Sequence, residues 1–551
     1  MNKAFWFLLL LLFFGVSSLR ANTDVSFEKS DQNSKVLVNK LRALIFQNKY
    51  LPIKPSQDSS IVIDGVDIPK EKKFIEKMNR FIGKPITIEK LQEIKTFVVN
   101  YFRDHGYSLV GVHIPAGQDI TDGDIHVIIQ VAKLGEINVE GGKYFSDEKI
   151  KNQIRIKTGE DILSDKIAQD LEWLNDNPFR RVSAIYIPSD NLNRTDILFQ
   201  VEDKFPLRVY AGYENNSYAV AGSSRFLAGF NAGNIFKTDQ QLNAQFISAL
   251  EPRRWWGFSG NYIIPLPWRN ILKFIGSYSR ALSDEEEFRL ITGSGWTAAG
   301  RYEIPLPIIY GLSHDFVLGI DFKRTNNFLT FADNLIYNRS IDVFQFLFKY
   351  QGTKDDRWGI TSFELSLYYS PGGITAFNNT SNFQVERPGA KSDYVYSELD
   401  IERLTKLPWD LSWVTNFLGQ LSFSKLLLSE QLAIGGNFTV RGFMENDVSG
   451  DSGILFKNEI RSPKIHFQKK KMERELQFLG FVDFGYVSDV DPNIVDKSSA
   501  ALLSIGPGLR YHLATYITIR FDYGFQIFRV KDRVFQETEG SRGHLSVIAS
   551  Y

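Results

Sequence analysis

The feature that most constrains this chain is a two-residue alternation of apolar and other side chains, which recurs from about residue 206 to the C-terminus. Four segments show it clearly: 207–213, 362–369, 517–525 and 545–551. A period of two belongs to a β-strand whose faces meet different surroundings. A soluble β-sandwich also alternates, but it rarely does so over roughly 300 residues. The pattern therefore favours a transmembrane antiparallel β-barrel with one face of each strand toward lipid.

The length of this region predicts the number of strands. At about 20 residues for a strand and its connection, residues 206–551 hold about 16 or 17 strands, and because bacterial barrels have even numbers we expect 16. The segment Tyr262–Pro267 (YIIPLP) recurs forty positions later as Tyr302–Pro307 (YEIPLP). Two strands with their turns fill such a period. Proline-rich turns suit the short periplasmic ends of hairpins.

The N-terminus has the parts of a secretory signal peptide. Lys3 supplies the positive region, residues 4–16 form an apolar run, and small residues before residue 22 offer a cleavage site, so we predict a signal peptide over 1–21. The run is shorter than the roughly 20 residues of a transmembrane helix. An exported barrel belongs in the outer membrane of a diderm bacterium or a related organelle.

Two small α/β modules are predicted between the signal peptide and the barrel. Ser34–Gln47 has apolar residues at helical spacing and predicts an amphipathic helix. Capping residues such as Thr87 and Ser146 precede further helices, and short apolar runs between turns predict strands. The open strand edges of such modules suit pairing with an extended client segment, called β-augmentation; the alternative is that the modules are spacers. The expected segments are a helix and linker over 22–58, modules over 59–132 and 133–204, and the barrel over 205–551.

The composition excludes several function classes. Lys plus Arg and Asp plus Glu number 64 each, so we expect no nucleic-acid partner, because phosphate binding needs an excess of basic residues. The chain has no Cys, which excludes disulfides, thiol nucleophiles and Cys-ligated metals. It also has no nucleophile-elbow, phosphate-loop or His-Glu-x-x-His motif. We expect no catalytic residues, no metal and no cofactor, and hence transport without ATP.

Two weak metal signals have simpler interpretations. The seven His are scattered along the chain and are expected to be structural. Glu445, Asp447 and Asp451 do not have the spacing of an EF-hand, so we expect them to be hydrated loop carboxylates.

The most specific motif is a glycine-rich segment that contains the sequence Val440-Arg441-Gly442-Phe443. Three glycines of this segment permit backbone conformations closed to other residues and so predict a tight hairpin, namely Gly435, Gly436 and Gly442. The Arg441 guanidinium is a rigid fork suited to bidentate pairing with a carboxylate. A second motif, Phe481-Val482-Asp483-Phe484-Gly485, and the glycines Gly506 and Gly508 follow in the next predicted strands.

Together these motifs, over residues 60–551, closely resemble the outer-membrane transporters of two-partner secretion, of the haemolysin-activator and filamentous-haemagglutinin transporter type. These belong to the superfamily of barrels with polypeptide-transport-associated (POTRA) domains. The resemblance implies that the loop 440–443 folds back into the barrel lumen and that Arg441 pairs with Asp483. Phe481 and Gly485 would complete the wall motif, and Tyr551 would be the terminal-strand signal where Phe is usual. For the N-terminal helix it suggests a plug of the lumen; the alternative is a helix that docks on a domain surface.

The function implied by the resemblance is export of a secreted partner exoprotein through the barrel, with two POTRA-like modules in the periplasm. The implied partners are the exoprotein, outer-membrane lipid, the general barrel-assembly machinery and periplasmic chaperones. One alternative is a barrel-assembly factor, although such factors usually carry more than two POTRA domains. Another is a passive porin or an adhesin that uses the long loop over 378–392. One departure from the family is residues 188–193, which lack the usual Pro-Gly-x-x-x-Gly turn.

Overall fold

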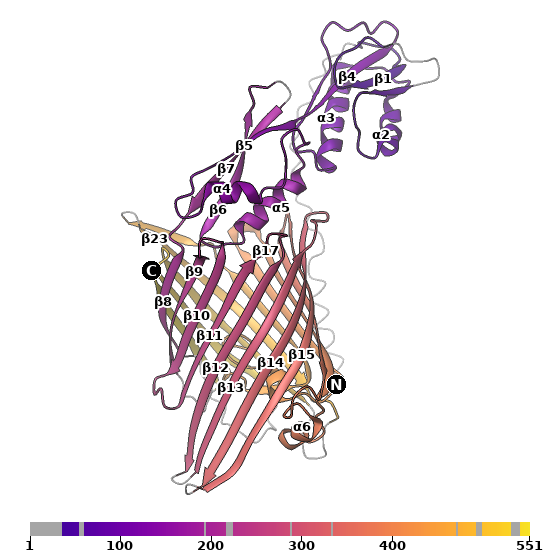
Figure 1. The fold of residues 1–551 in the computed structure, drawn as a ribbon. Coiled ribbons are helices and arrows are strands. Elements are labelled where there is room, and N and C mark those ends of the chain that lie inside the picture. The colour runs from indigo at the N-terminus through magenta and orange to yellow at the C-terminus, as the bar shows by residue number, and fades with distance from the viewer. Residues whose placement is uncertain are drawn as a thin grey trace. The chain divides into compact units, whose positions relative to one another are not determined.

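The computed structural model describes most of the chain and divides it into two compact units, Met1–Ala132 and Lys133–Tyr551 (Figure 1). The predicted signal peptide over 1–21 lies outside the described residues. The described residues are 36–53, 60–191, 194–215, 224–286, 289–331, 334–469, 472–491, 499–529 and 540–551.

The first unit is a four-stranded sheet with helices on it, in the strand order β2-β1-β4-β3. The central strand β1 runs parallel to both neighbours, β2 and β4, and β3 runs antiparallel to β4. Thr87 caps α3 as predicted, because its side chain accepts from the Lys90 backbone N–H. The elements are β1 Ala43–Gln47, β2 Ile61–Asp64, α2 Glu71–Met78, η1 Asn79–Phe81, α3 Ile88–Asp104, β3 Val110–His113 and β4 Asp124–Val131.

The predicted helix over Ser34–Gln47 is wrong where the structure describes it. Ala43–Gln47 is strand β1, and all five of its residues are buried. A short strand that is apolar on both faces produces a continuous apolar run, which periodicity alone does not separate from a helical turn. The first module therefore begins before residue 59, and these residues belong to its sheet instead of forming a plug.

The second unit begins with a three-stranded sheet in the order β5-β7-β6. Strand β5 is parallel to β7, whereas β6 is antiparallel to it and lies at the edge of the sheet. Ser146 caps α4 by accepting from the Lys149 backbone N–H, as predicted. No helix among the described residues is long and apolar enough to cross a membrane. The elements are β5 Lys133–Glu140, α4 Asp147–Gln153, α5 Ser164–Asn175, β6 Arg180–Pro188 and β7 Arg194–Asp203.

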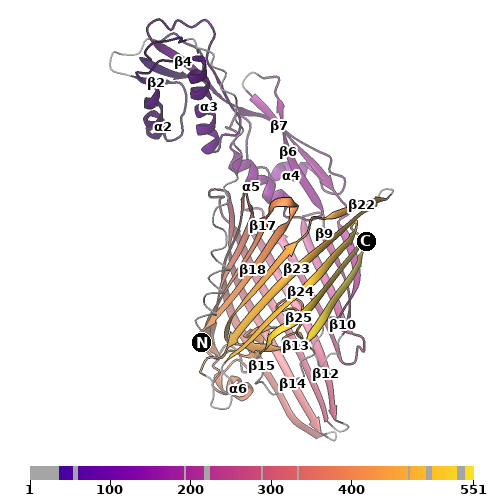
Figure 2. The same cartoon turned by 180° about the vertical axis from the view of Figure 1, so that it is seen from behind.

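The rest of the second unit is a closed antiparallel barrel, visible in Figures 1 and 2 as a cylinder of tilted strands. Strands β21 and β22 both pair with β23 and form one interrupted strand, so in the described part of the chain sixteen strands close the barrel, as predicted. The last strand, β26, closes the barrel against β8. The strands are β8 Leu207–Glu214, β9 Arg225–Ile235, β10 Gln240–Ala249, β11 Trp255–Pro265, β12 Ile271–Glu286, β13 Arg289–Pro305, β14 Leu312–Phe331, β15 Asn334–Asp356, β16 Gly359–Pro371, β17 Asp393–Lys406, β18 Ser412–Ser422, β21 Ser452–Arg461, β22 Ile465–Lys469, β23 Met472–Ser488, β24 Ser499–Leu513, β25 Ile517–Arg529 and β26 Ser541–Ser550.

The two faces of the barrel wall differ as the alternation predicts. Large apolar side chains of successive strands are exposed on the outside, for example Phe258, Phe274 and Trp296. Polar side chains such as Asp321 and Gln345 are buried on the inside, where the Gln345 amide donates to the Asp321 carboxylate at 3.2 Å. An apolar outer band and a polar interior are what a barrel in lipid requires.

Two long connections between barrel strands carry their own structure. The connection between β16 and β17 contains helix α6 (Thr380–Glu386), whose Phe383 is fully buried. The connection between β18 and β21 contains the 3₁₀ turn η4 (Leu428–Glu430) and the short strands β19 (Leu432–Ile434) and β20 (Val448–Gly450). The second of these holds the motif with Arg441.

Candidate functional site in the barrel lumen

The glycine-rich segment forms a hairpin, because β19 pairs with β20 in an antiparallel ladder. Gly435 and Gly436 follow β19 with φ of 109° and 103°, which is the region that favours glycine. A Cβ atom on Gly435 would lie 2.5 Å from the carbonyl oxygen of Met444, so the two sides of the loop meet without room for a side chain. The predicted tight hairpin is therefore present.

Arg441 lies at the centre of the site and is 1% exposed. Its Nε donates to Oδ2 of Asp483 at 2.6 Å and its Nη2 donates to Oδ1 at 2.8 Å. Its Nη1 donates to Oε1 of Glu459 at 2.6 Å. The guanidinium carbon also lies 3.6 Å from the centre of the Phe481 ring. The guanidinium thus makes a bidentate pair with Asp483, a second pair with Glu459 and a cation–π contact.

The cluster continues along the barrel wall beyond the residues singled out from the sequence. Glu459 also accepts two bonds from Arg461, at 2.8 and 2.6 Å. Asp522 accepts two bonds from Arg510, at 2.8 and 2.9 Å, and lies 3.7 Å from Nη1 of Arg441. The strand alternation places these side chains on the lumen face, but it does not show which of them meet across strands.

An apolar contact accompanies the ion pairs. Val440 and Phe443, on either side of the tip, are 0% and 1% exposed. They pack in a cluster that joins the loop to the barrel wall: Leu432, Ile434, Val440, Phe443, Val448, Leu455, Val487, Ala500 and Leu502. Burial of this apolar surface holds the hairpin in the lumen independently of the charges.

Three glycines of the barrel wall, Gly485, Gly506 and Gly508, lie where a side chain would collide with neighbouring residues. A Cβ on Gly485 would lie 3.0 Å from the Val440 side chain. A Cβ on Gly506 would lie 2.8 Å from the Phe481 ring, and one on Gly508 would lie 2.7 Å from the Leu479 side chain. Gly485 therefore makes room for the loop, and Gly506 makes room for the ring that contacts Arg441.

The tip residue Gly442 meets strands β25 and β26, a contact that the sequence did not reveal. Its N–H donates to Nε2 of His544 at 3.0 Å, and its carbonyl accepts from Nε2 of Gln526 at 2.6 Å. A Cβ on Gly524 would lie 2.6 Å from the Cα of Gly442. The loop tip therefore lies backbone against backbone on β25.

The expectation that Asp451 is hydrated is wrong. Asp451 is fully buried and accepts from the backbone N–H groups of Leu426 and Val490, both at 2.9 Å. Arg387, which follows α6, donates to Asp451 at 3.0 Å and to Asp489 at 3.0 Å. The connection that contains α6 is thereby tied to the base of the hairpin.

Tyr551 lies beside the closure of the barrel. Its backbone N–H and carbonyl each bond with Val209 of β8 at 2.9 Å, whereas the residue is 88% exposed. The backbone thus continues the pairing between β26 and β8.

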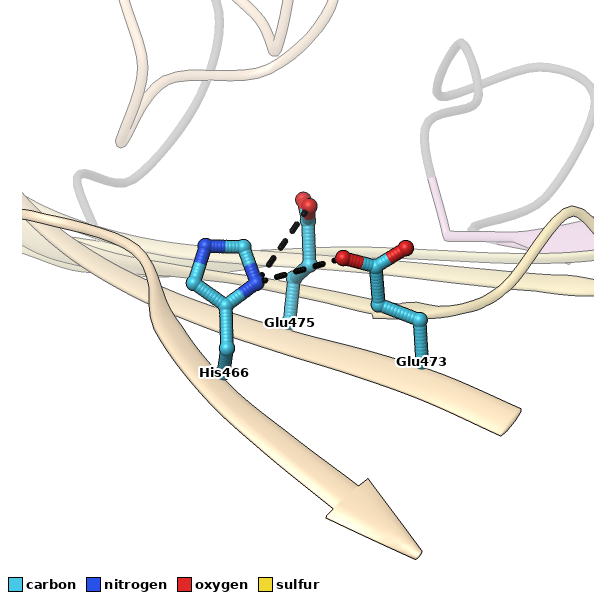
Figure 3. A group of neighbouring side chains, drawn as sticks. All are labelled: His466, Glu473 and Glu475. Carbon is cyan, nitrogen blue, oxygen red and sulfur yellow. Dashed lines mark ion pairs between the residues drawn. The ribbon is translucent and has the colours of Figure 1, made fainter. Parts of the chain in front are cut away.

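One histidine lies in a cluster of charged side chains on the β22–β23 hairpin (Figure 3). Nδ1 of His466 is 3.5 Å from Glu473 and 3.7 Å from Glu475. The three side chains offer ligand atoms within 4.8 Å of one another. Lys464 donates to Glu475 at 2.7 Å, so ion pairs explain why these side chains lie together and no metal ion is needed.

Both proline-rich repeats form the ends of β11 and β13 and continue into the turns that follow, where turns were predicted. They line a cavity of about 690 Å³ together with side chains of α5 such as Trp173. Asp176 also lines it, and burial raises the pKa of its carboxyl group. Nearby, Nη1 of Arg180 on β6 lies 2.6 Å from both carboxylate oxygens of Asp239 in the β9–β10 turn. These contacts attach the second module to the barrel.

A closed sixteen-stranded barrel in the described part of the chain, a preceding α/β module and a lumen hairpin held by a buried Arg–carboxylate cluster define an outer-membrane transport barrel of the POTRA superfamily. The chain belongs to the haemolysin secretion/activation protein family ShlB/FhaC/HecB, whose sequence model matches residues 193–511. A POTRA model, described as a surface antigen variable number repeat, matches residues 132–204.

Curated relatives and solved structures agree with this assignment. The heme/hemopexin transporter protein HuxB of Haemophilus influenzae is 20% identical over 461 residues, which are 78% of this chain and 76% of HuxB. The outer membrane transporter CdiB of Dickeya dadantii is 21% identical over 408 residues, which are 69% of this chain and 67% of CdiB. The structure of CdiB from Escherichia coli superposes with a TM-score of 0.76 at 15% identity, over 96% of this chain and 93% of CdiB. The protein is therefore an outer-membrane transporter of two-partner secretion with its POTRA region in the periplasm, and the assembly-factor alternative is not favoured.

Proposed function

We propose that this transporter exports its partner exoprotein through the barrel lumen and that the Arg441 cluster sets the position of the lumen hairpin during export. The observation that carries this proposal is the bidentate pairing of a fully buried Arg441 with Asp483, at 2.6 and 2.8 Å, inside a barrel of the ShlB/FhaC/HecB family. The hairpin occupies part of the lumen, so an exported chain must pass beside it or displace it.

The Arg441 cluster suits a lumen hairpin that has two stable positions, docked and released. A buried guanidinium is tolerated only while its carboxylate partners remain in place, and removing one partner costs about 3–5 kcal/mol. Small displacements of Arg441 are therefore opposed, whereas a full withdrawal would return the charges to water. We infer that the hairpin is either docked or released during export.

We further propose that the client is captured at the edge of the second module. Strand β6 is an edge strand and exposes Ile185 and Ile187 by 46% and 40%. An extended client strand that paired with β6 would gain main-chain hydrogen bonds and would cover these apolar side chains.

The double substitution Ile185→Ser and Ile187→Ser is expected to weaken client binding roughly thirtyfold, because about 1 kcal/mol of apolar burial is lost at each half-exposed site. Binding is measured by titrating the client segment into the full-length transporter. Ile88→Ser is the matched control, since Ile88 is 62% exposed but begins helix α3. Equal affinity of the double variant and the parent protein would exclude capture at β6.

We also propose the remaining partners of the barrel. The exposed aromatic side chains of its outer face suit contact with outer-membrane lipid. The terminal Tyr551 would be recognised by the barrel-assembly machinery after periplasmic chaperones have delivered the chain. The family membership supports a transporter that catalyses no covalent reaction.

The test of the function is to deplete the protein and to compare the extracellular and outer-membrane proteomes. Selective loss of one or a few large secreted proteins, with other barrels intact, is the expected result. Broad loss of barrel proteins would point to an assembly factor instead, and unchanged fractions would point to a passive pore or an adhesin.

A further inference from the structure

The lumen hairpin has a second attachment to the wall that uses no charged group. Arg441 is bound by β21 and β23 through Glu459 and Asp483. The next residue, Gly442, is bound by β25 and β26, where His544 accepts from the Gly442 N–H and Gln526 donates to the Gly442 carbonyl. Both polar groups of one loop residue are thus held by side chains of the last two strands.

The bond from the Gly442 N–H determines which ring nitrogen of His544 carries a proton. A backbone N–H only donates, so Nε2 of His544 carries no proton and accepts the bond. A neutral His544 ring then carries its proton on Nδ1, which has no hydrogen-bond partner among the described residues. Oε1 of Gln526 likewise has no partner in the described part of the chain.

Through these two atoms, His544 and Gln526 make no bond to the polar network of the described barrel wall. Buried polar atoms are normally hydrogen-bonded, and an unpaired one costs free energy. His544 is 3% exposed, and Nε2 of its ring accepts a hydrogen bond from the loop. A purely structural role in the wall would not explain this arrangement, because in the described part of the wall these side-chain atoms, Nδ1 of His544 and Oε1 of Gln526, have no hydrogen-bond partner.

The backbone at the tip makes the contact possible. Gly442 has φ of 89°, and it lies against Gly524, where a Cβ atom would be 2.6 Å from the Gly442 backbone nitrogen. The absence of side chains on both residues brings the Gly442 peptide within reach of the two side chains from β25 and β26.

We propose that His544 and Gln526 are positioning residues that clamp the Gly442 peptide and hold the lumen hairpin docked, separately from the Arg441 cluster. This inference deepens the proposed function and rests on it, since it assigns the residues that set the resting position of the hairpin. Release of the hairpin requires both the charged cluster and this neutral clamp to open.

The test follows the mobility of the hairpin in purified, lipid-inserted protein without any client. The chain has no cysteine, so Phe438→Cys introduces a single attachment point for a nitroxide label. Phe438 lies in the hairpin and is 60% exposed, which leaves room for the label. The ratio of mobile to immobile label in the electron paramagnetic resonance spectrum reports released against docked hairpin.

Removing either partner of the clamp is expected to raise this ratio. His544→Leu and Gln526→Met should each raise it about fivefold, the factor that corresponds to the net free energy of one neutral hydrogen bond. His544→Gln should stay near the parent protein, because the glutamine oxygen can accept the Gly442 N–H. His512→Leu is the matched control, since His512 bonds with Thr518 of the wall and not with the hairpin.

An unchanged ratio in both His544→Leu and Gln526→Met would overturn the proposal, as would an equal rise in His544→Gln. Insertion of each variant is checked by its heat-modifiable mobility in gel electrophoresis. If His544→Leu does not insert, Gln526→Met decides, because it leaves the histidine in place. The measurement needs no export, so a failure of the clamp and a failure of the export function are distinguished.

Discussion

Replacing Arg441 with Ala is expected to impair export strongly while the barrel still inserts into the membrane. The substitution leaves Asp483 and Glu459 buried in the lumen without their shared cation, and Asp483 is 0% exposed. Breaking such a pair costs about 3–5 kcal/mol, which corresponds to a roughly 10²–10⁴-fold shift from docked to released hairpin. The barrel itself should persist, since its strands are held by backbone ladders that do not include Arg441.

The measurement compares secreted client with transporter in the outer membrane, at matched amounts of transporter. Arg403→Ala is the control, because Arg403 also bonds an aspartate of the wall, Asp356, at 2.7 Å, but does not contact the hairpin. It should export normally. Arg441→Lys should fall between the two, because an ammonium does not reproduce the planar fork.

A second comparison separates the ion pair from other effects of Arg441. If the pair is the functional unit, Asp483→Ala in an Arg441→Ala background adds little further loss, since the interaction is already absent. Fully additive losses, or normal export by an inserted Arg441→Ala variant, would show that the pair does not set the position of the hairpin.

The strands of the barrel could be predicted because each of them lies between two different solvents. Lipid outside and polar surroundings inside impose the two-residue period on residues such as Ile519, Phe521 and Tyr523, and no long-range information is needed to see it. The strand β1 shows the opposite case. Its residues Ala43–Gln47 are buried on both faces, so no two-residue period remains, and the apolar spacing alone predicts a helix.

The lumen site was only partly predictable for a related reason. Arg441 and Asp483 were paired through the resemblance, not through their spacing. The alternation places Asp522 and Gly524 on the lumen side of β25, yet it does not show what lies opposite them. Gly442 and His544 are 102 residues apart, and a contact between a backbone N–H and a ring nitrogen leaves no trace in one sequence. Such contacts emerge only when the hairpin is seen docked.

Gly524→Ala is expected to impair export almost as strongly as the loss of Arg441. The new Cβ would lie 2.6 Å from both Cα and N of Gly442 and 2.8 Å from the carbonyl carbon of Arg441. These are backbone atoms, so they cannot turn aside, and a comfortable carbon contact needs about 3.5–4.0 Å. Gly524 is not among the residues with positive φ, so alanine fits its backbone and the effect is steric.

The hairpin must therefore move by about 1 Å, which lengthens the bonds of Gly442 to His544 and Gln526 and disturbs the Arg441 fork. Overpacking of this kind costs about 1–3 kcal/mol, a roughly 10–100-fold shift toward the released hairpin.

Gly543→Ala is the matched control on the neighbouring strand, because the atoms nearest to its new Cβ would be side-chain atoms of Tyr523 and Phe521 at 3.4 and 3.5 Å. The nitroxide at position 438 and the amount of secreted client are measured on both variants. Because an alanine at 524 changes no charge and no hydrogen-bonding group, a mobile label with lost export would show that the docked position itself is required. An immobile label with normal export would show that the hairpin tolerates displacement and that its contact with β25 has no part in transport.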